Sequence, residues 1–262
     1  MRLFDTHCHI ASESFDEDRD AVIARFLAAG VARATVVADP CEEIPNQEPV
    51  FALAEAHDFL YAAIGAHPHN ASRWDAAAEA ELRRWLAHPK CRLLGEIGLD
   101  YHYDLSPRDV QREVFEFQLE MAVALDCPVQ LHIREAHGDC TDMLRARTRA
   151  GRMPAGIMHC YTGSWESAKG YLDMGLYISL SGAVTFKNAP KLAEVAQKLP
   201  ADRLLIETDC PYMAPVPMRG RRNEPAFLPH TFARIAELRG EDPERLAEQL
   251  WANANRALRI ED

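Results

Sequence analysis

The sequence lacks several features that would place it in other protein classes. None of its seven cysteines forms a C-x-x-C pair, which disfavours both a cysteine-based zinc ribbon and a disulfide framework. No apolar run approaches the roughly 20 residues that span a bilayer, and the N-terminus has neither a basic start nor an apolar signal core. We therefore expect a cytoplasmic protein with reduced thiols and no membrane association.

A surplus of positive charge is also absent. The formal net charge of −11 disfavours nonspecific binding to duplex nucleic acid, because lysine and arginine supply that affinity by displacing counterions. Any nucleic-acid substrate must therefore be bound locally, and the run R-G-R-R at 219–222 is the best candidate for steering a polyanion. There is no low-complexity tract, internal repeat or domain linker, and the 48% hydrophobic content is typical of a globular chain.

Short apolar runs alternate with longer amphipathic ones along the chain. Eight runs are predicted strands, at 2–7, 34–39, 61–67, 92–98, 128–133, 155–160, 176–182 and 203–209. Repeated right-handed βαβ units produce this alternation, which predicts an α/β fold, a closed (β/α)8 TIM barrel, with residues 1–262 as a single domain. An open doubly wound sheet would give the same alternation, but the chain has no G-x-G-x-x-G fingerprint.

Two helices between and after these strands are predicted in more detail. In the segment 106–125, Ser106 is expected to cap the helix and Pro107 to take its first position. The apolar stripe expected on this helix consists of Val110, Val114, Phe117, Met121 and Leu125. A second helix is expected to begin at Asp242 and Pro243.

The segment D-T-H-C-H near the N-terminus raises the question of which of its side chains point toward an active site. Strand alternation places His7 and His9 on the same side as Asp5 and turns Cys8 away. The same alternation is expected to turn Cys160 and Cys210 from the site. Asp5 has two open interpretations, an acceptor that orients a histidine or an acid satisfied by hydroxyls and amides of the barrel.

Five of the predicted strands carry metal-binding side chains at or near their carboxyl ends, where barrel active sites lie. These side chains are His7, His9, Glu96, His132, His159 and Asp209. Such a set of nitrogen and oxygen donors suits two divalent cations, with Mg, Mn and Zn all chemically reasonable. His7, His9 and Asp209 would hold one ion, His132 and His159 the other, and Glu96 would bridge ions about 3.5 to 4 Å apart.

These residues also carry a family resemblance. The motifs D-T-H-C-H, G-A-H-P-H, G-E-I-G-L-D-Y, L-H-I-R, H-C-Y-T-G, E-T-D-C-P-Y and R-N-E-P-A resemble, in order, those of the TatD-type metal-dependent deoxyribonucleases, a branch of the amidohydrolase-like barrels. The resemblance implies a barrel, divalent ions on the six donors, and cleavage of phosphodiesters at free ends of single-stranded DNA. It also implies that His67 faces the substrate. The chain departs from the family pattern at Glu135, at Tyr161 and in the segment 39–49, which bears on substrate preference.

The expected mechanism uses ions that lower the pKa of a shared water toward about 7. Asp209 would accept the proton from that water, Glu96 would hold both ions, and His67 and Arg134 would offset charge on the phosphoryl oxygens. Tyr161 is a candidate for stacking on a base.

Two other functions compete with this one. A hydrolase of small amides, esters or lactones would use nearly the same donors, because these barrels change substrate through their loops. A non-catalytic metal- or nucleic-acid-binding module is disfavoured by the net charge of −11. No obligate protein partner is expected.

Overall fold

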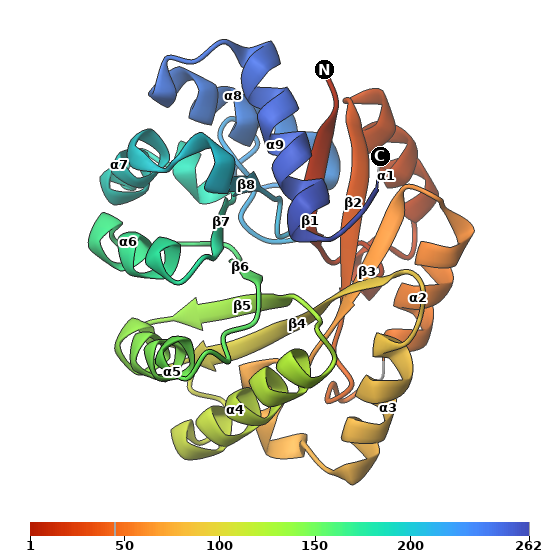
Figure 1. The fold of residues 1–262 in the computed structure, drawn as a ribbon. Helices are drawn as coiled ribbons and strands as arrows, with labels where there is room; N and C mark the ends of the chain where they lie inside the picture. The colour runs from red at the N-terminus through yellow and green to blue at the C-terminus, as the bar shows by residue number, and fades with distance from the viewer. Residues whose placement is uncertain (45, 262) are drawn as a thin grey trace.

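The structure is a computed structural model, and it describes residues 1–44 and 46–261. Its strands form one sheet in which all neighbours are parallel and follow each other in chain order from β1 to β8 (Figure 1). The strands are β1 (Leu3–Cys8), β2 (Val31–Ala38), β3 (Leu60–Ile64), β4 (Cys91–Asp100), β5 (Val129–Arg134), β6 (Gly156–Met158), β7 (Tyr177–Leu180) and β8 (Leu204–Ile206).

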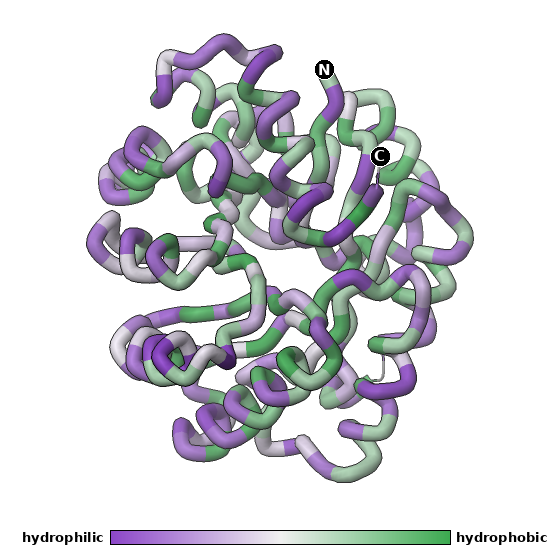
Figure 2. The backbone as a smooth tube through the Cα atoms, in the orientation of Figure 1, coloured by the Kyte–Doolittle hydropathy of each residue, from purple (hydrophilic) through white to green (hydrophobic). Residues whose placement is uncertain are grey.

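Helices follow the strands and cover the outside of the sheet (Figure 1). The α-helices are α1 (Arg19–Ala28), α2 (Gln47–Ala56), α3 (Ala76–Leu86), α4 (Arg108–Ala124), α5 (His137–Arg149), α6 (Trp165–Asp173), α7 (Pro190–Lys198), α8 (Leu228–Arg239) and α9 (Pro243–Ala257). Short 3-10 helices are η1 (Glu13–Phe15), η2 (Pro68–Arg73), η3 (Gly182–Thr185), η4 (Ala201–Arg203) and η5 (Pro225–Phe227). Along the outer helices hydrophobic and hydrophilic residues alternate, as expected for elements with one buried face (Figure 2).

The ends of β1 and β8 meet just beyond the strands themselves. The backbone N–H of Asp209 donates to the carbonyl of His7 at 3.0 Å, and that of His9 donates to the carbonyl of Cys210 at 2.9 Å. These bonds bring the first and last strands together at their carboxyl ends. The predicted (β/α)8 barrel is therefore confirmed. At its mouth, residues that follow the first strand lie beside residues that follow the last strand.

Four strands, β3, β6, β7 and β8, are shorter than their sequence pattern indicated, and two of them precede proposed ligands. β6 and β8 have three residues each, so the chain leaves the extended conformation before it reaches His159 and Asp209. Cys160 and Asp209 both have positive φ, 40° and 55°. Loop geometry rather than strand alternation therefore aims the side chains that follow these two strands.

The two detailed helix predictions had different outcomes. α9 begins as predicted, with Asp242 capping it by accepting a hydrogen bond from the backbone N–H of Arg245. Ser106 does not cap α4, because its hydroxyl donates to the carbonyl of His69 at 2.9 Å and accepts from the N–H of Ser72 at 3.0 Å. Pro107 precedes the first helical residue instead of occupying that position. Within the described residues, no helix is long and apolar enough to cross a bilayer.

Candidate metal centre

The six side chains predicted as metal ligands come together at the barrel mouth. His7 comes from β1 and His9 follows it, Glu96 and His132 lie on β4 and β5, and His159 and Asp209 follow β6 and β8. Their nitrogen and oxygen atoms fall into overlapping groups in which all members lie within 4.8 Å of one another. Residues separated by as many as 202 positions in the sequence, His7 and Asp209, thus share one small volume.

Glu96 stands at the centre of this cluster. Its Oε1 lies 2.5 Å from Nδ1 of His132 and 2.8 Å from Nε2 of His159. Its other oxygen, Oε2, lies 3.5 Å from Nε2 of His7. The two oxygens of one carboxylate therefore face two different sets of imidazoles.

His7, His9 and Asp209 form the second set. The Nε2 atoms of His7 and His9 are 3.0 Å apart, and Oδ1 of Asp209 lies 3.6 Å from each of them. His7 is fully buried, whereas His9 and Asp209 are partly accessible at the mouth. This set sits on the opposite side of Glu96 from His132.

Three buried residues hold the other nitrogen of a clustered imidazole. Gln130 Oε1 lies 2.9 Å from His7 Nδ1, and Glu207 Oε1 lies 2.9 Å from His159 Nδ1. Asp100 Oδ2 lies 3.0 Å from His132 Nε2. Because each acceptor fixes the tautomer of its imidazole, the nitrogen that faces Glu96 keeps its lone pair free.

Sequence reasoning missed these three acceptors. Gln130 stands two residues before His132, and Glu207 two residues before Asp209, spacings that place a polar side chain on the ligand face one step deeper in the barrel. The same two-residue spacing pointed to Asp5, so it could also have identified Gln130 and Glu207 as residues of the ligand face. Asp100 ends β4 four residues after Glu96, and its shared contact with His69, at 2.8 Å, had no sequence signal.

Asp5 takes the second of its two expected roles. Its carboxylate accepts hydrogen bonds from the N–H of Thr208 at 2.8 Å and from the Thr208 hydroxyl at 2.5 Å, and its contact with His7 is to the backbone N–H. Burial raises the pKa of Asp5 to about 7. Asp5 therefore ties β1 to the segment after β8, while Gln130 orients the His7 ring.

The electrostatics of the cluster set the charge of each donor. Burial, followed by the neighbouring His159, lowers the pKa of His7 to about 3, so its ring is neutral at pH 7. Burial alone would raise the pKa of Glu96, but the surrounding imidazoles, His159 first, hold it well below the usual range. Burial also works against the carboxylate of Asp209, yet the hydrogen bond with His9 and the nearby imidazoles lower its pKa. Both acids are therefore ionised.

Three of the imidazoles, His9, His132 and His159, have a pKa above the usual value. At His9 burial would lower the pKa, but the hydrogen bond and charge of Asp209, together with the charge of Glu96, outweigh it. Burial would lower the pKa of His132 and of His159, but in both cases the charge of Glu96 and the hydrogen bonds to neighbouring carboxylates together outweigh it. A hydrogen bond to Asp100 adds to the effect at His132, and the charge of Glu207 adds to it at His159. A cation entering the cluster would compete with protons at these positions.

The three residues predicted to contact substrate occupy different environments. His67 Nε2 lies 3.4 Å from Glu96 Oε1, and its Nδ1 accepts from the N–H of His69 at 3.1 Å. Arg134 is partly buried and its guanidinium stacks 4.7 Å from the centre of the Tyr103 ring. Tyr161 is only 2% exposed, and its hydroxyl donates to the carbonyl of Ser164 at 2.6 Å. The placement of Tyr161 argues against stacking on a base, because its ring is packed below the surface.

The cysteines next to ligand positions behave in two ways. Cys8 and Cys210 are fully buried, as expected. The expectation for Cys160 is wrong, because positive φ at this residue breaks the strand alternation on which it rested. Its thiol lies 3.2 Å from the Ser181 hydroxyl, and burial and then the charge of Asp209 raise its pKa well above the usual value.

The donor set is chemically suited to divalent cations. It offers four imidazole nitrogens and two ionised carboxylates, and for three imidazoles a buried acceptor holds the nitrogen that points away from Glu96. Imidazole and carboxylate donors suit zinc, manganese or magnesium. A (β/α)8 barrel with such donors at the carboxyl ends of its strands has the architecture of the metal-dependent barrel hydrolases.

Comparison with known proteins places the chain within that class. The family model described as TatD related DNase matches residues 4–259, and the chain belongs to this family. It is 42% identical to a metal-dependent hydrolase, YabD, of Bacillus subtilis over 98% of this chain and 99% of that one. It is 38% identical to the 3'-5' ssDNA/RNA exonuclease TatD of Pantoea ananatis, over 97% of this chain and 98% of that one.

A solved structure supports the same assignment. The crystal structure of YjjV, a TatD homologue from Escherichia coli, matches with a TM-score of 0.91 at 32% identity, covering 99% of both chains. The TatD resemblance inferred from the motifs is thus confirmed. The match over nearly the full length of both chains indicates that the barrel fold is shared.

Proposed function

We propose that this protein is a divalent-metal-dependent hydrolase that cleaves phosphodiester bonds at the free ends of single-stranded DNA. The observation that carries the proposal is the position of Glu96, whose two oxygens face two separate sets of donors. Paired cations held in this way serve in-line displacement at phosphorus. The relatives named as single-stranded DNA and RNA exonucleases support the same substrate class.

The residues divide between two ions in a simple way. His7, His9 and Asp209 would hold one ion, His132 and His159 the other, and Glu96 would contribute one oxygen to each. When bound, the ions would lower the pKa of a water toward about 7 and polarise a phosphoryl oxygen. Magnesium, manganese and zinc are all compatible with the donors.

The protein's own side chains supply the proton transfer and the orientation of the substrate. Asp209 is ionised and partly accessible, so its carboxylate can accept the proton of the attacking water. Burial lowers the pKa of His67 to about 4, which keeps its ring neutral at pH 7. Because its Nδ1 accepts from the N–H of His69, its Nε2 carries the hydrogen and can donate to a phosphoryl oxygen. Arg134 would contribute a second, charged donor.

The setting of the activity follows from the chain as a whole. All seven cysteines are free thiols, which supports residence in the cytoplasm. We propose that residues 1–262 form one catalytic domain that acts without an obligate protein partner. Pro45, within the unusual segment 39–49, lies outside the described residues.

The test compares substrates of different chemistry. End-labelled single-stranded DNA, duplex DNA with blunt ends, and simple ester, amide and lactone substrates are incubated with the purified protein, with and without a chelator. We expect shortening of the single strands that the chelator stops and that His132→Ala abolishes. Turnover of only the ester, amide or lactone would favour the small-substrate hydrolase, and no metal-dependent turnover of any substrate would contradict the proposal.

A further inference from the structure

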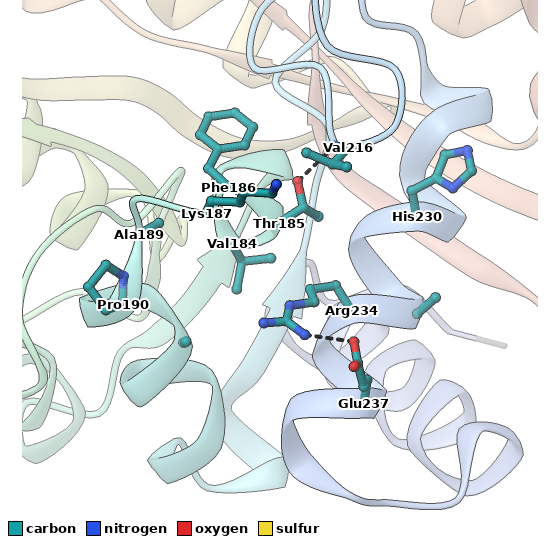
Figure 3. Close-up of a pocket in the computed structure, with 12 residues that line it drawn as sticks. Val184, Thr185, Phe186, Lys187, Ala189, Pro190, Val216, His230, Arg234 and Glu237 are labelled. Atoms are coloured by element: carbon teal, nitrogen blue, oxygen red, sulfur yellow. Dashed lines mark hydrogen bonds and ion pairs between the residues drawn. The ribbon is translucent and has the colours of Figure 1, made fainter.

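A cavity of about 670 Å³ lies outside the metal centre, between the amino-terminal half of α7 and most of the length of α8 (Figure 3). Its walls come from the loop after β7, residues 184–189, from Val216 in the loop after β8, and from His230 and Arg234 of α8. We call this cavity the rim groove. Both loops follow the carboxyl ends of their strands, so the rim groove opens on the same face of the barrel as the metal centre.

The rim groove is positively charged on a protein whose net charge is −11. Lys187 and Arg234 line it, and the guanidinium of Arg219 lies 3.9 Å from the centre of the Phe186 ring at its edge. Glu237 is the one acidic side chain among the lining residues of the described chain, and it pairs with Arg234 at 2.7 Å. No carboxylate of the described residues forms an ion pair with Lys187 or Arg219. Two cationic side chains thus remain available to an anion.

The rim groove also holds a surface on which a flat ring can stack. Phe186 is partly exposed and carries the Arg219 guanidinium over its ring. Bases stack both on aromatic rings and on guanidinium planes without a strong sequence preference. His230 of α8 also lines the rim groove (Figure 3). Positive charge next to a stacking surface is the combination that proteins use to bind single-stranded nucleic acid.

The floor of the rim groove is packed and connects directly to the metal centre. The Thr185 hydroxyl donates to the carbonyl of Gly182 at 2.6 Å and accepts from the N–H of Val216 at 2.8 Å, which joins the two loops. Gly182 packs so closely that an added Cβ would lie 2.1 Å from the carbonyl oxygen of Met213. The preceding residue, Ser181, contacts Cys160 beside the ligand His159. The loops are therefore fixed to each other between the groove and the ions' donors.

We propose that the rim groove binds the part of a single-stranded nucleic acid that extends away from the cleaved end, with Lys187 and Arg219 on its phosphates and a base against Phe186. This inference rests on the proposed nuclease function and names the route of its substrate. It assigns to Arg219 the steering role that the run 219–222 suggested. Arg222 of that run is not assigned to the substrate, because it forms an ion pair with Asp18 at 2.8 Å.

The experiment separates the groove from the metal centre by substrate length. On this proposal a dinucleotide occupies the metal centre alone, whereas a 12-mer single strand also extends along the rim groove. Lys187→Ala combined with Arg219→Ala removes the two available cations. The matched control is Lys198→Ala combined with Arg203→Ala, which removes the same charge from the end of α7 and from η4 before β8, at the opposite end of the barrel. Binding of the 12-mer is measured by fluorescence anisotropy in chelator at several salt concentrations, and turnover is measured with both substrates.

We expect the groove variant to bind the 12-mer roughly tenfold more weakly and to show a salt-dependence slope lower by about 1.4, about 0.7 for each phosphate contact to a single strand. Its kcat/KM for the dinucleotide should stay within about twofold of wild type, and the control should keep both properties. Phe186→Leu, which leaves the charge intact, should weaken 12-mer binding without changing the salt slope.

Equal losses in the groove variant and the control, or equal losses on both substrates, would overturn the inference. In that case cleavage of single strands by the wild type would still support the proposed function. If the wild type cleaves no single strand, the proposed function fails, and the anisotropy data still decide whether the rim groove binds one. A rim groove that binds a peptide or a duplex in preference to single strands would also contradict the proposal.

Discussion

Replacing Gln130 by methionine removes the one buried amide that orients His7 without changing any proposed ligand. Gln130 is fully buried, its Oε1 lies 2.9 Å from His7 Nδ1, and its Nε2 donates to the carbonyl of Thr6 at 2.9 Å. Methionine has a similar volume and neither hydrogen-bonding group. The His7 ring then loses the acceptor that keeps its hydrogen on Nδ1 and its lone pair on Nε2.

Two effects of this substitution can be estimated separately. Losing an acceptor behind a metal-bound histidine typically weakens metal binding about 10- to 100-fold, or about 1.4 to 2.7 kcal/mol. Two lost hydrogen bonds with buried partners should also lower the free energy of unfolding by about 2 to 4 kcal/mol. Because the pKa of His7 is about 3, protonation of its ring does not complicate the measurement near neutral pH.

Gln118→Met is the matched control. Gln118 is also fully buried and also makes two hydrogen bonds, accepting from the N–H of Ala66 at 2.7 Å and donating to its carbonyl at 3.1 Å. Both variants should lose similar stability in denaturant titrations of the metal-free protein. Only Gln130→Met should bind Mn²⁺ or Zn²⁺ more weakly in competition with an indicator chelator. Equal metal affinities in the two variants would refute the role given to Gln130.

Three further predictions concern the proton acceptor, the pH dependence and the fold. Asp209→Asn should lower kcat by about 10²- to 10⁴-fold while elemental analysis still finds bound metal, and near-normal turnover would exclude Asp209 as the proton acceptor. Metal binding should release protons and weaken as the pH falls, because the raised pKa values of His132 and His159 keep protons on the metal-free site. Calorimetry in two buffers of different ionisation enthalpy should then give different observed binding enthalpies, and equal enthalpies would contradict the prediction. Asp242→Ala should cost about 1 kcal/mol of stability by removing the cap of α9, with kcat/KM unchanged, and a loss of activity at full stability would contradict its structural role.

The sequence predicted the barrel and the convergence of the six donors because both depend on a simple periodicity. Apolar runs recur as strands, and the residues that end parallel strands meet at one rim. The ligand roles of the six side chains stay a prediction, since their convergence is a matter of geometry alone. The acceptors behind them were harder to assign. The spacing from His132 places Gln130 on the ligand face, but nothing in the linear order pairs Gln130 of β5 with His7 of β1, across the barrel interior.

α4 shows a second reason why sequence patterns fall short. Of the predicted apolar stripe, Phe117 and Leu125 are 37% and 48% exposed, while the inward face includes Gln111 and Gln118. Gln111 donates to the carbonyl of Asp100 and accepts from its backbone N–H, which fixes the end of β4 next to His132. A hydropathy pattern treats such glutamines as surface residues. Buried amides that satisfy loop backbone are visible only once the loops are placed.

Buried acceptors orient three imidazoles of the metal centre in the same way relative to Glu96. Gln130, Glu207 and Asp100 each hold the nitrogen of an imidazole that points away from Glu96. The neighbouring imidazoles keep Glu96 and Asp209 ionised despite their burial, and burial keeps His7 neutral. The donors are therefore positioned for cations before any cation arrives, which reduces the reorganisation required on binding to the loss of protons from His132 and His159.

The most direct test is a crystal structure of the protein grown with Mn²⁺ and measured for anomalous scattering at the manganese absorption edge. We predict two anomalous peaks at the barrel mouth, both in contact with Glu96, one beside His7 and His9 and the other beside His132 and His159. A single peak, or peaks that leave Glu96 in contact with only one ion, would contradict the paired-ion centre.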